Sequence, residues 1–130
     1  SNEERIIDTP KEIDNSNRAS PISLLVAMDH RFNELLEKSK SKAYQTYLSG
    51  ESILTRNGYL PATTSEERQV LIDSTPAGVK YKASGWGISL GPDMGHSYGT
   101  ATIKDKAYNY LRIWRREKTG WKIALEVFRY

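Results

Sequence analysis

The sequence has 130 residues, enough for one domain that buries roughly two thirds of its unfolded surface. Its 19 Lys and Arg against 16 Asp and Glu give a net charge of +3, and 38% hydrophobic with 27% charged residues excludes collagen-like and wholly disordered chains. The absence of cysteine excludes disulfide scaffolds, thiolate nucleophiles and cysteine-bound zinc, and no apolar run approaches the roughly 18 residues of a membrane span. The composition therefore predicts a soluble protein without a cofactor.

Residues 1–19 differ in composition from the rest of the chain. They are polar, with Pro10 and the run Asp14-Asn15-Ser16-Asn17, and we interpret them as an N-terminal arm or linker before a domain at residues 20–130. The first residue is Ser1, as in a mature protein whose leader was removed or in a tagged recombinant product. A polar arm before a domain without cysteine favours an exported protein over a cytoplasmic one. The sequence does not identify the compartment.

Three helices are predicted in the first half of the domain. The first begins at Ser20-Pro21, a typical helix start, and its apolar side chains recur every three or four residues to about Lys38. A shorter helix is predicted at about residues 42–48. Thr64 and Glu67 have the spacing of a capping box, so a third helix should start there and end near the next proline.

The pattern then becomes that of strands. A short strand is predicted at Ser52–Arg56, and four longer segments rich in Tyr, Trp, Ile, Thr and Val follow the third helix. These segments are residues 79–89, 95–103, 107–116 and 120–130. Turn signals and no helices separate them, so they should form an antiparallel meander. Helices first and consecutive strands afterwards predict an α+β fold.

The register of the last two strands decides which side chains share a face. If Arg116 and Trp121 flank the last turn, the pairs on one face are Trp114 with Ile123, Arg112 with Leu125 and Tyr110 with Val127. The other face would carry Leu111, Ile113, Ala124, Glu126 and Phe128. Both faces are partly apolar, so we expect helices to cover one face and a partner subunit or a pocket to cover part of the other.

Aromatic and arginine side chains of this region are candidate ligand contacts. Trp114, Tyr110 and Tyr98 are typical walls for a flat apolar molecule, although strand aromatics also serve as plain core. Arg56 is a candidate anchor for a ligand carboxylate, with pairing to a helix acid as the alternative. Arg112 is a second candidate anchor if it reaches into a polar cavity, and the alternative is that it extends over a rim. Further candidate contacts are Tyr59 and Trp86.

Two residues are candidates for acid–base catalysis. His96 has an imidazole that titrates near neutral pH, and the alternative is an exposed turn histidine. Glu126 is the best carboxylate for a general base if its face is the concave one, because burial would raise its pKa. The sequence has no phosphate-binding loop and no metal-ligand spacing, so we expect no metal. The basic stretch at residues 112–122 is interpreted as a solvated hairpin end, so no nucleic-acid partner is expected.

The order of elements resembles the nuclear transport factor 2-like (SnoaL-like, cystatin-like) superfamily, in particular a bacterial branch of unknown function related to ketosteroid isomerase. The segments that carry the resemblance are Met28-Asp29-His30-Arg31-Phe32, Ala43-Tyr44 to Tyr47-Leu48, Ile53-Leu54-Thr55-Arg56, Met94 to Gly99, Tyr110 to Arg116 and Gly120-Trp121-Lys122. The resemblance implies a cone of three helices and a strongly curved antiparallel sheet, with a cavity at its wide end. It also implies a homodimer packed through the sheet.

These observations leave three functions open. The first is a binding domain for a small apolar or carboxylate-bearing molecule held in an aromatic pocket. The second is an isomerase-like or dehydratase-like enzyme acting on a carbonyl compound with Glu126 or His96 as base, although the isomerase set of an aspartate base with tyrosine and acid donors has no residue-by-residue match. The third is a protein-association domain that uses its sheet face.

Overall fold

The computed structural model describes residues 20–89, 91 and 93–130, so the predicted arm at residues 1–19 lies outside the described part. The elements are α1 (Pro21–Lys38), α2 (Lys40–Tyr47), β1 (Leu48–Arg56), α3 (Ser65–Ser74), β2 (Lys80–Ile88), β3 (Met94–Ile103), β4 (Lys106–Glu117) and β5 (Gly120–Arg129). This order confirms the predicted helices and strands. The second helix begins earlier than predicted and the first strand is longer.

Side-chain caps explain where the helices begin. Ser20 accepts a hydrogen bond from the Ser23 backbone at 3.2 Å and precedes Pro21, as predicted for α1. Ser39 ends α1 and also caps α2 by accepting from the Lys42 backbone at 3.3 Å, which is why α2 starts immediately after α1. Both halves of the predicted capping box at Thr64 are present in α3.

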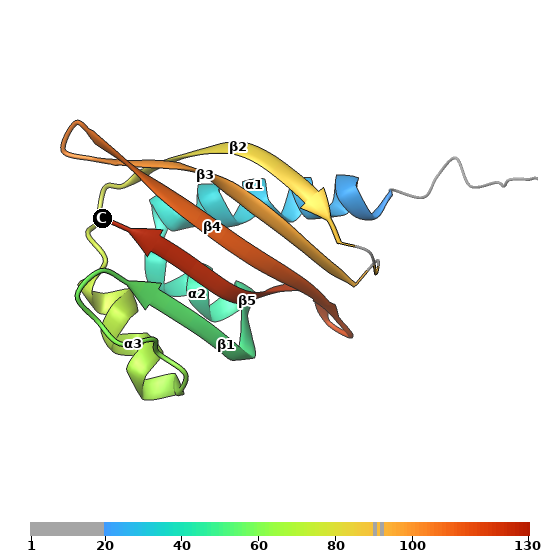
Figure 1. Cartoon of the computed structure of the whole chain (residues 1–130), viewed down its shortest axis with the longest axis horizontal. Coiled ribbons are helices and arrows are strands. Elements are labelled where there is room, and N and C mark those ends of the chain that lie inside the picture. Colours follow the sequence, from blue (N-terminus) through green and yellow to red (C-terminus); the bar gives the residue numbers. More distant parts are fainter. Residues whose placement is uncertain (1–19, 90, 92) are drawn as a thin grey trace, which may run out of the picture.

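The strands form one five-stranded sheet in the order β1-β5-β4-β3-β2. The meander β2 to β5 is antiparallel as predicted, whereas β1 joins the edge of the sheet parallel to β5. Figure 1 shows α1 and α2 on one face of the sheet and α3 beside β1. The result is an α+β fold with a mixed, curved sheet, and none of the described helices covers its opposite face.

A β-bulge in β5 changes the predicted register. Trp114 pairs with Ile123 as predicted, but Ile113 then pairs with Leu125, which leaves Ala124 as an extra residue. Beyond the bulge, Arg112 pairs with Glu126 and Tyr110 pairs with Phe128. The predicted pairs of Arg112 with Leu125 and Tyr110 with Val127 were therefore wrong. Because one extra residue reverses which face each later side chain occupies, Glu126 and Phe128 turn toward the helices.

A second bulge lies in β2 before the glycine pair of the Gly85-Trp86-Gly87 segment. Ala83 pairs with Gly99 and Gly85 pairs with Tyr98, which leaves Ser84 unpaired. A Cβ atom on Gly85 would meet the ring of Tyr98, and one on Gly87 would meet the ring of His96. The two glycines therefore make room for aromatic rings that cross over β2.

The hydrophobic core lies between α1, α2 and the covered sheet face. Three of its aromatic members, Trp114, Phe32 and Tyr44, are at most 2% exposed. The Phe32 ring contacts both others edge-on, at centroid distances of 6.0 Å to Trp114 and 5.4 Å to Tyr44. This packing fixes α1 and α2 against β4.

Gly99 should tolerate no larger side chain. A Cβ atom there would collide with the Lys82 carbonyl oxygen, and it would lie 2.7 Å from the Tyr110 hydroxyl. We expect Gly99→Ala to lower the free energy of unfolding by about 1–3 kcal/mol because β2 and β3 must separate. Chemical denaturation measures this, with Gly50→Ala as the matched control because no atom lies within 4 Å of its Cβ position. Equal stabilities of the two variants would contradict the prediction.

Candidate functional site

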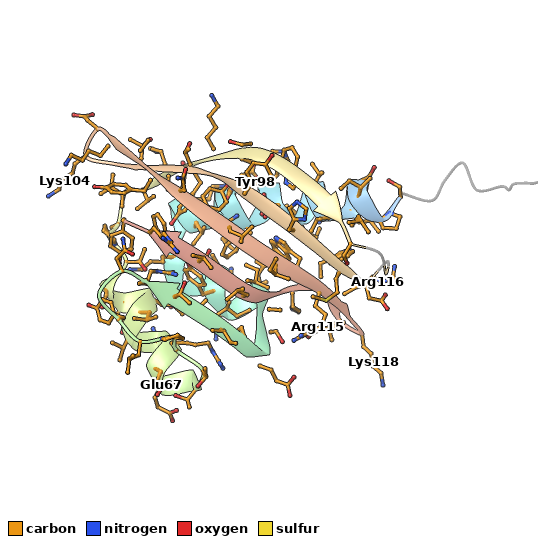
Figure 2. All side chains as sticks on the ribbon, viewed as in Figure 1. Glu67, Tyr98, Lys104, Arg115, Arg116 and Lys118 are labelled. Atoms are coloured by element: carbon orange, nitrogen blue, oxygen red, sulfur yellow. The ribbon has the colours of Figure 1, made fainter. Side chains whose placement is uncertain are left out.

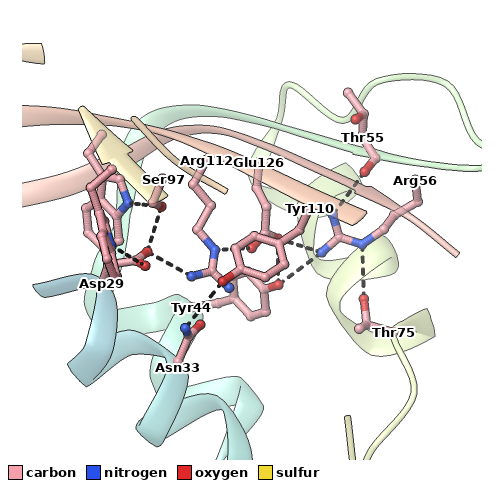
Figure 3. A network of polar contacts seen from close by, with 12 residues as sticks. Asp29, Asn33, Tyr44, Thr55, Arg56, Thr75, Ser97, Tyr110, Arg112 and Glu126 are labelled. Atoms are coloured by element: carbon pink, nitrogen blue, oxygen red, sulfur yellow. Dashed lines mark hydrogen bonds and ion pairs between the residues drawn. The ribbon is translucent and has the colours of Figure 1, made fainter. Parts of the chain in front are cut away.

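The centre of the fold is the side chain of Arg112 on β4, which is completely buried beneath α1. Its Nη1 atom lies 2.9 Å from Oδ1 of Asp29 on α1, and its Nε atom lies 3.2 Å from Oε2 of Glu126 on β5. Figure 3 shows the guanidinium between the two carboxylates. Arg112 therefore joins the β4–β5 hairpin to α1, whose Asp29 lies 83 residues earlier in the sequence.

Glu126 extends this network toward β1 and α2. Its Oε1 atom accepts hydrogen bonds from Arg56 Nη2 at 2.8 Å and from the Tyr44 hydroxyl at 2.6 Å. Arg56 Nη2 also donates to the Tyr44 oxygen at 3.0 Å, and its Nε donates to Oγ1 of Thr75 at 3.2 Å. Glu126 thus lies between two buried arginines, with a phenol as a third donor.

Asp29 ends the network on the side of β2 and β3. Its Oδ1 atom accepts from the Ser97 hydroxyl at 2.7 Å, and its Oδ2 atom accepts from the Trp86 indole at 3.0 Å. The Trp114 indole donates to the Ser97 oxygen at 3.1 Å. Asp29 is completely buried, so these donors replace the water that its carboxylate would otherwise bind.

Aromatic rings surround the Arg112 guanidinium. Its Cζ atom lies 4.2 Å from the ring centroid of Tyr110, 4.6 Å from that of Phe32 and 5.5 Å from that of Tyr81. A guanidinium over a ring face is attracted by the ring quadrupole, more strongly when water is excluded. The site is thus a sealed ion cluster of Arg56 and Arg112 with Asp29 and Glu126, in which the formal charges cancel.

The cluster keeps Glu126 ionised. Burial works to raise the pKa of its carboxyl, but Arg56 and Arg112, with the Tyr44 hydroxyl, outweigh burial and hold the pKa below its ordinary value of 4.5. Burial and the adjacent Glu126 charge raise the pKa of Tyr44 well above its usual range. A carboxylate with a lowered pKa is a weak base near neutral pH, so this environment does not favour the proton transfer considered for Glu126.

The sequence-predicted site residues fall into separate places. Trp114, Tyr110, Arg112, Arg56 and Glu126 lie together under the helices, each at most 4% exposed. Trp86 lies at the edge of this group, between Asp29 and the His30 ring. His96 and Tyr98 lie on the opposite face with their rings stacked at 6.2 Å, and Tyr59 lies on the loop after β1. The structure therefore does not place Tyr98 or His96 in one space with Tyr110 and Trp114.

Asp29, Tyr44 and Ser97 complete the cluster and were not among the predicted site residues. Asp29 carried a signal in the sequence, because it lies four residues after Leu25 and three before Phe32, both buried on the same helix stripe. A carboxylate on a buried stripe requires a cationic partner. Ser97 lies beside an exposed Tyr98 on β3, and no local pattern marks it.

The face of the sheet opposite the helices carries an apolar surface. Because strand side chains alternate, the neighbours of the buried cluster residues point to this face. We define the outer apolar face as Ile53, His96, Tyr98, Leu111, Ile113, Leu125 and Val127. Tyr98 is 48% exposed, Ile53 38% and Leu111 36%. Figure 2 shows Tyr98 over the middle of β3, whereas the labelled charges Lys104 and Arg116 lie at the sheet ends.

The described cavities lie around the cluster, and neither Trp114 nor Arg112 lines any of the four. One of about 350 Å³ lies between α2, β1 and α3. Another of about 320 Å³ lies between α1 and β2. Among the described helices, none is long and apolar enough to cross a membrane, and the described residues hold no group of three or more potential metal ligands.

Comparisons with known proteins define the fold. No protein-family model matches the chain, and no curated protein matches it in sequence. A ketosteroid isomerase-like protein from Erwinia carotovora atroseptica superimposes with a TM-score of 0.69 at 16% identity, covering 86% of this chain and 97% of that one. An NTF2-like protein with a cystatin-like fold from Novosphingobium aromaticivorans gives 0.60 at 12% identity, covering 82% and 79%.

The hub of CaMKII from S. rosetta is also similar, with a TM-score of 0.64 at 15% identity over 85% of this chain and 97% of that one. The chain therefore has the nuclear transport factor 2-like, cystatin-like fold, which confirms the predicted resemblance at the level of the fold. Identities this low show the architecture and do not carry over an activity.

Neutralising Glu126 should destabilise the protein strongly. Glu126→Gln leaves Arg56 and Arg112 without a buried counter-charge, so we expect the free energy of unfolding at pH 7 to fall by about 3–5 kcal/mol. Because folding lowers the pKa of Glu126, its contribution is complete above pH 4.5 and is lost as the pH falls through the lower folded value. The difference between wild type and variant should therefore narrow in acid.

Denaturant unfolding from pH 7 to pH 3 measures this difference. Glu37→Gln is the control, because the Glu37 pair with Lys80 is on the surface and should contribute about 0–1 kcal/mol. A loss for Glu126→Gln no larger than that of the control would contradict the sealed ion cluster.

Proposed function

We propose that this chain is a protein-association domain that pairs with a second copy of itself through the outer apolar face. The observation that supports this most is a contrast between the two sides of the sheet. The side under the helices is filled by buried, mutually paired side chains, and the other side presents apolar side chains that no described element covers. Association through the sheet is thus favoured over a pocket beneath the helices.

The filled interior argues against the other two candidate functions. The residues expected to form the walls and anchors of a pocket contact one another, and both arginines already bind protein carboxylates. Admitting a ligand carboxylate would displace Asp29 or Glu126 and leave a buried charge unpaired, at a cost of several kcal/mol. Catalysis would need a base with a pKa near neutrality, and Glu126 has a lowered one.

The composition of the outer apolar face is typical of an interface. Its centre holds aliphatic and aromatic side chains and no Asp, Glu, Lys or Arg. Charged groups lie at its ends, where Arg115 pairs with Glu117 at 3.3 Å. A water-exposed sheet face normally carries polar and charged residues, whereas an apolar centre with a polar rim is characteristic of protein contacts.

The size and charge of the outer apolar face favour a second copy of this chain as its partner. Strands of 9–12 residues in a five-stranded sheet make a face roughly 30–40 Å by 20 Å, or about 600–800 Å². This matches the roughly 800 Å² that each partner contributes to a standard interface. An uncharged centre does not repel its own copy, so a twofold axis can place identical faces together. The likeness to a protein described as a hub supports self-association.

The oligomeric state tests the proposal. We expect wild type to sediment at twice its 14.8 kDa mass. Leu111→Lys should raise the dissociation constant at least about tenfold because a charge enters the apolar centre. Leu60→Lys is the matched control, since Leu60 is 88% exposed on the loop after β1, outside the outer apolar face. A monomeric wild type at micromolar concentration, or equal dissociation of both variants, would overturn the proposal.

A further inference from the structure

A groove between α1 and β2 opens on the helix side of the sheet, away from the outer apolar face. Its volume is about 320 Å³, at the lower end of the range for small-molecule pockets, about 300–1,000 Å³. Asn33 and Glu34 line it from α1, and Tyr81 and Lys82 line it from β2. This groove is separate from the proposed dimer contact, so any ligand there would act independently of self-association.

The buried wall of the groove holds an unsatisfied amide. Asn33 is 7% exposed, and its Oδ1 atom has no hydrogen-bond partner among the described residues. Its Nδ2 atom donates one long hydrogen bond of 3.5 Å to the Tyr110 hydroxyl, so a second N–H of the same amide remains available. An unpaired buried carbonyl costs about 1–3 kcal/mol, and a ligand that donates to it recovers that free energy.

A second unsatisfied group lies behind Asn33. The Nη2 atom of Arg112 is buried and has no partner among the described residues. The Arg112 guanidinium lies 4.2 Å from the ring of Tyr110, which Asn33 binds, and 5.5 Å from the ring of Tyr81, which lines the groove. One acceptor and one donor without partners therefore lie beside Tyr110, as Figure 3 shows for Asn33 and Arg112.

The charge around this wall favours a neutral ligand. Arg112 is already paired with Asp29 and Glu126, and the formal charges of the ion cluster cancel. Glu34 and Glu37 add negative charge at the groove, with Lys82 as a cation on its β2 side. A ligand carboxylate would meet the like charges of Glu34 and Glu37, whereas an amide offers a donor and an acceptor without net charge.

We propose that the groove between α1 and β2 binds a neutral small molecule through a primary amide edge. The ligand N–H donates to Oδ1 of Asn33, and the ligand carbonyl accepts from the free Asn33 N–H. The ligand body lies between Tyr81 and α1.

Three probes that share a benzene ring and a carbonyl group test the amide edge on wild-type protein. Benzamide carries the edge, benzoate replaces it with a charge, and N,N-dimethylbenzamide lacks the N–H donors. Nitrogen-15 NMR titration should show saturable benzamide shifts at residues 30–37 and 81–83, with the other two probes binding about three- to tenfold more weakly. Equal or tighter binding of benzoate or N,N-dimethylbenzamide would overturn the proposal, as would the absence of groove shifts with benzamide.

A pair of variants locates the contact. Asn33→Leu removes the carbonyl oxygen and the N–H groups but keeps the same branched arrangement of side-chain heavy atoms, and we expect it to weaken benzamide binding by the same three- to tenfold factor. Gln45→Leu is the matched control, because Gln45 is an amide that lines the separate groove between α2, β1 and α3. Unchanged benzamide binding by Asn33→Leu, or equal weakening in both variants, would overturn the assignment to Asn33. The probe comparison on wild type remains decisive if Asn33→Leu fails to fold.

Discussion

The pairing of the Arg112 guanidinium with two carboxylates is the interaction on which the rest of the structure depends. Arg112 extends from the middle of the sheet, Asp29 comes from α1 and Glu126 from the last strand, and all three side chains are buried. A buried charge without a partner is far more costly than a missing apolar contact. The position of α1 over β4 and the register of β5 must therefore satisfy this ion pairing together with the apolar packing.

The bulge at Ala124 makes that pairing possible and also shapes the other face. With uninterrupted alternation, Glu126 would point away from the helices, into the centre of the outer apolar face, and Arg112 would lose one counter-charge. With the bulge, the carboxylate reaches Arg112 and Arg56, and the outer centre keeps only uncharged side chains. One extra residue thus separates a charged, sealed interior from an apolar exterior suited to association.

Much of the fold could be predicted from the sequence because its signals are local. Ser20-Pro21, the capping box at Thr64 and the apolar stripe of α1 each act within one or two helical turns. The sequence pattern also indicated that both sheet faces are partly apolar, as they are in the structure. The bulge was not predictable, since nothing in the residues around Ala124 distinguishes it from an ordinary strand position.

The candidate site was harder to predict because its contacts are distant in sequence. Arg56 and Glu126 meet only because β1 pairs parallel with β5, and the strand pattern does not show that pairing. Arg56, Arg112 and Glu126 were predicted as site residues, the arginines as ligand anchors and Glu126 as a base. Residue type alone does not show whether the carboxylate that pairs with an arginine belongs to the protein or to a ligand. Asp29 was the residue that pointed to a charged partner inside the protein, because it is a carboxylate on the buried stripe of α1.

Hydrogen exchange of the Arg112 side chain tests the sealed ion cluster most directly. Nitrogen-15 NMR resolves the Nε–H group of each arginine, and Arg116, whose side chain is 47% exposed, serves as an internal reference. If Arg112 is closed off between Asp29 and Glu126, its Nε–H exchanges with water at least about a hundredfold more slowly than that of Arg116 and is insensitive to salt. Exchange of Arg112 at the rate of Arg116 would show an interior open to solvent and would contradict this account.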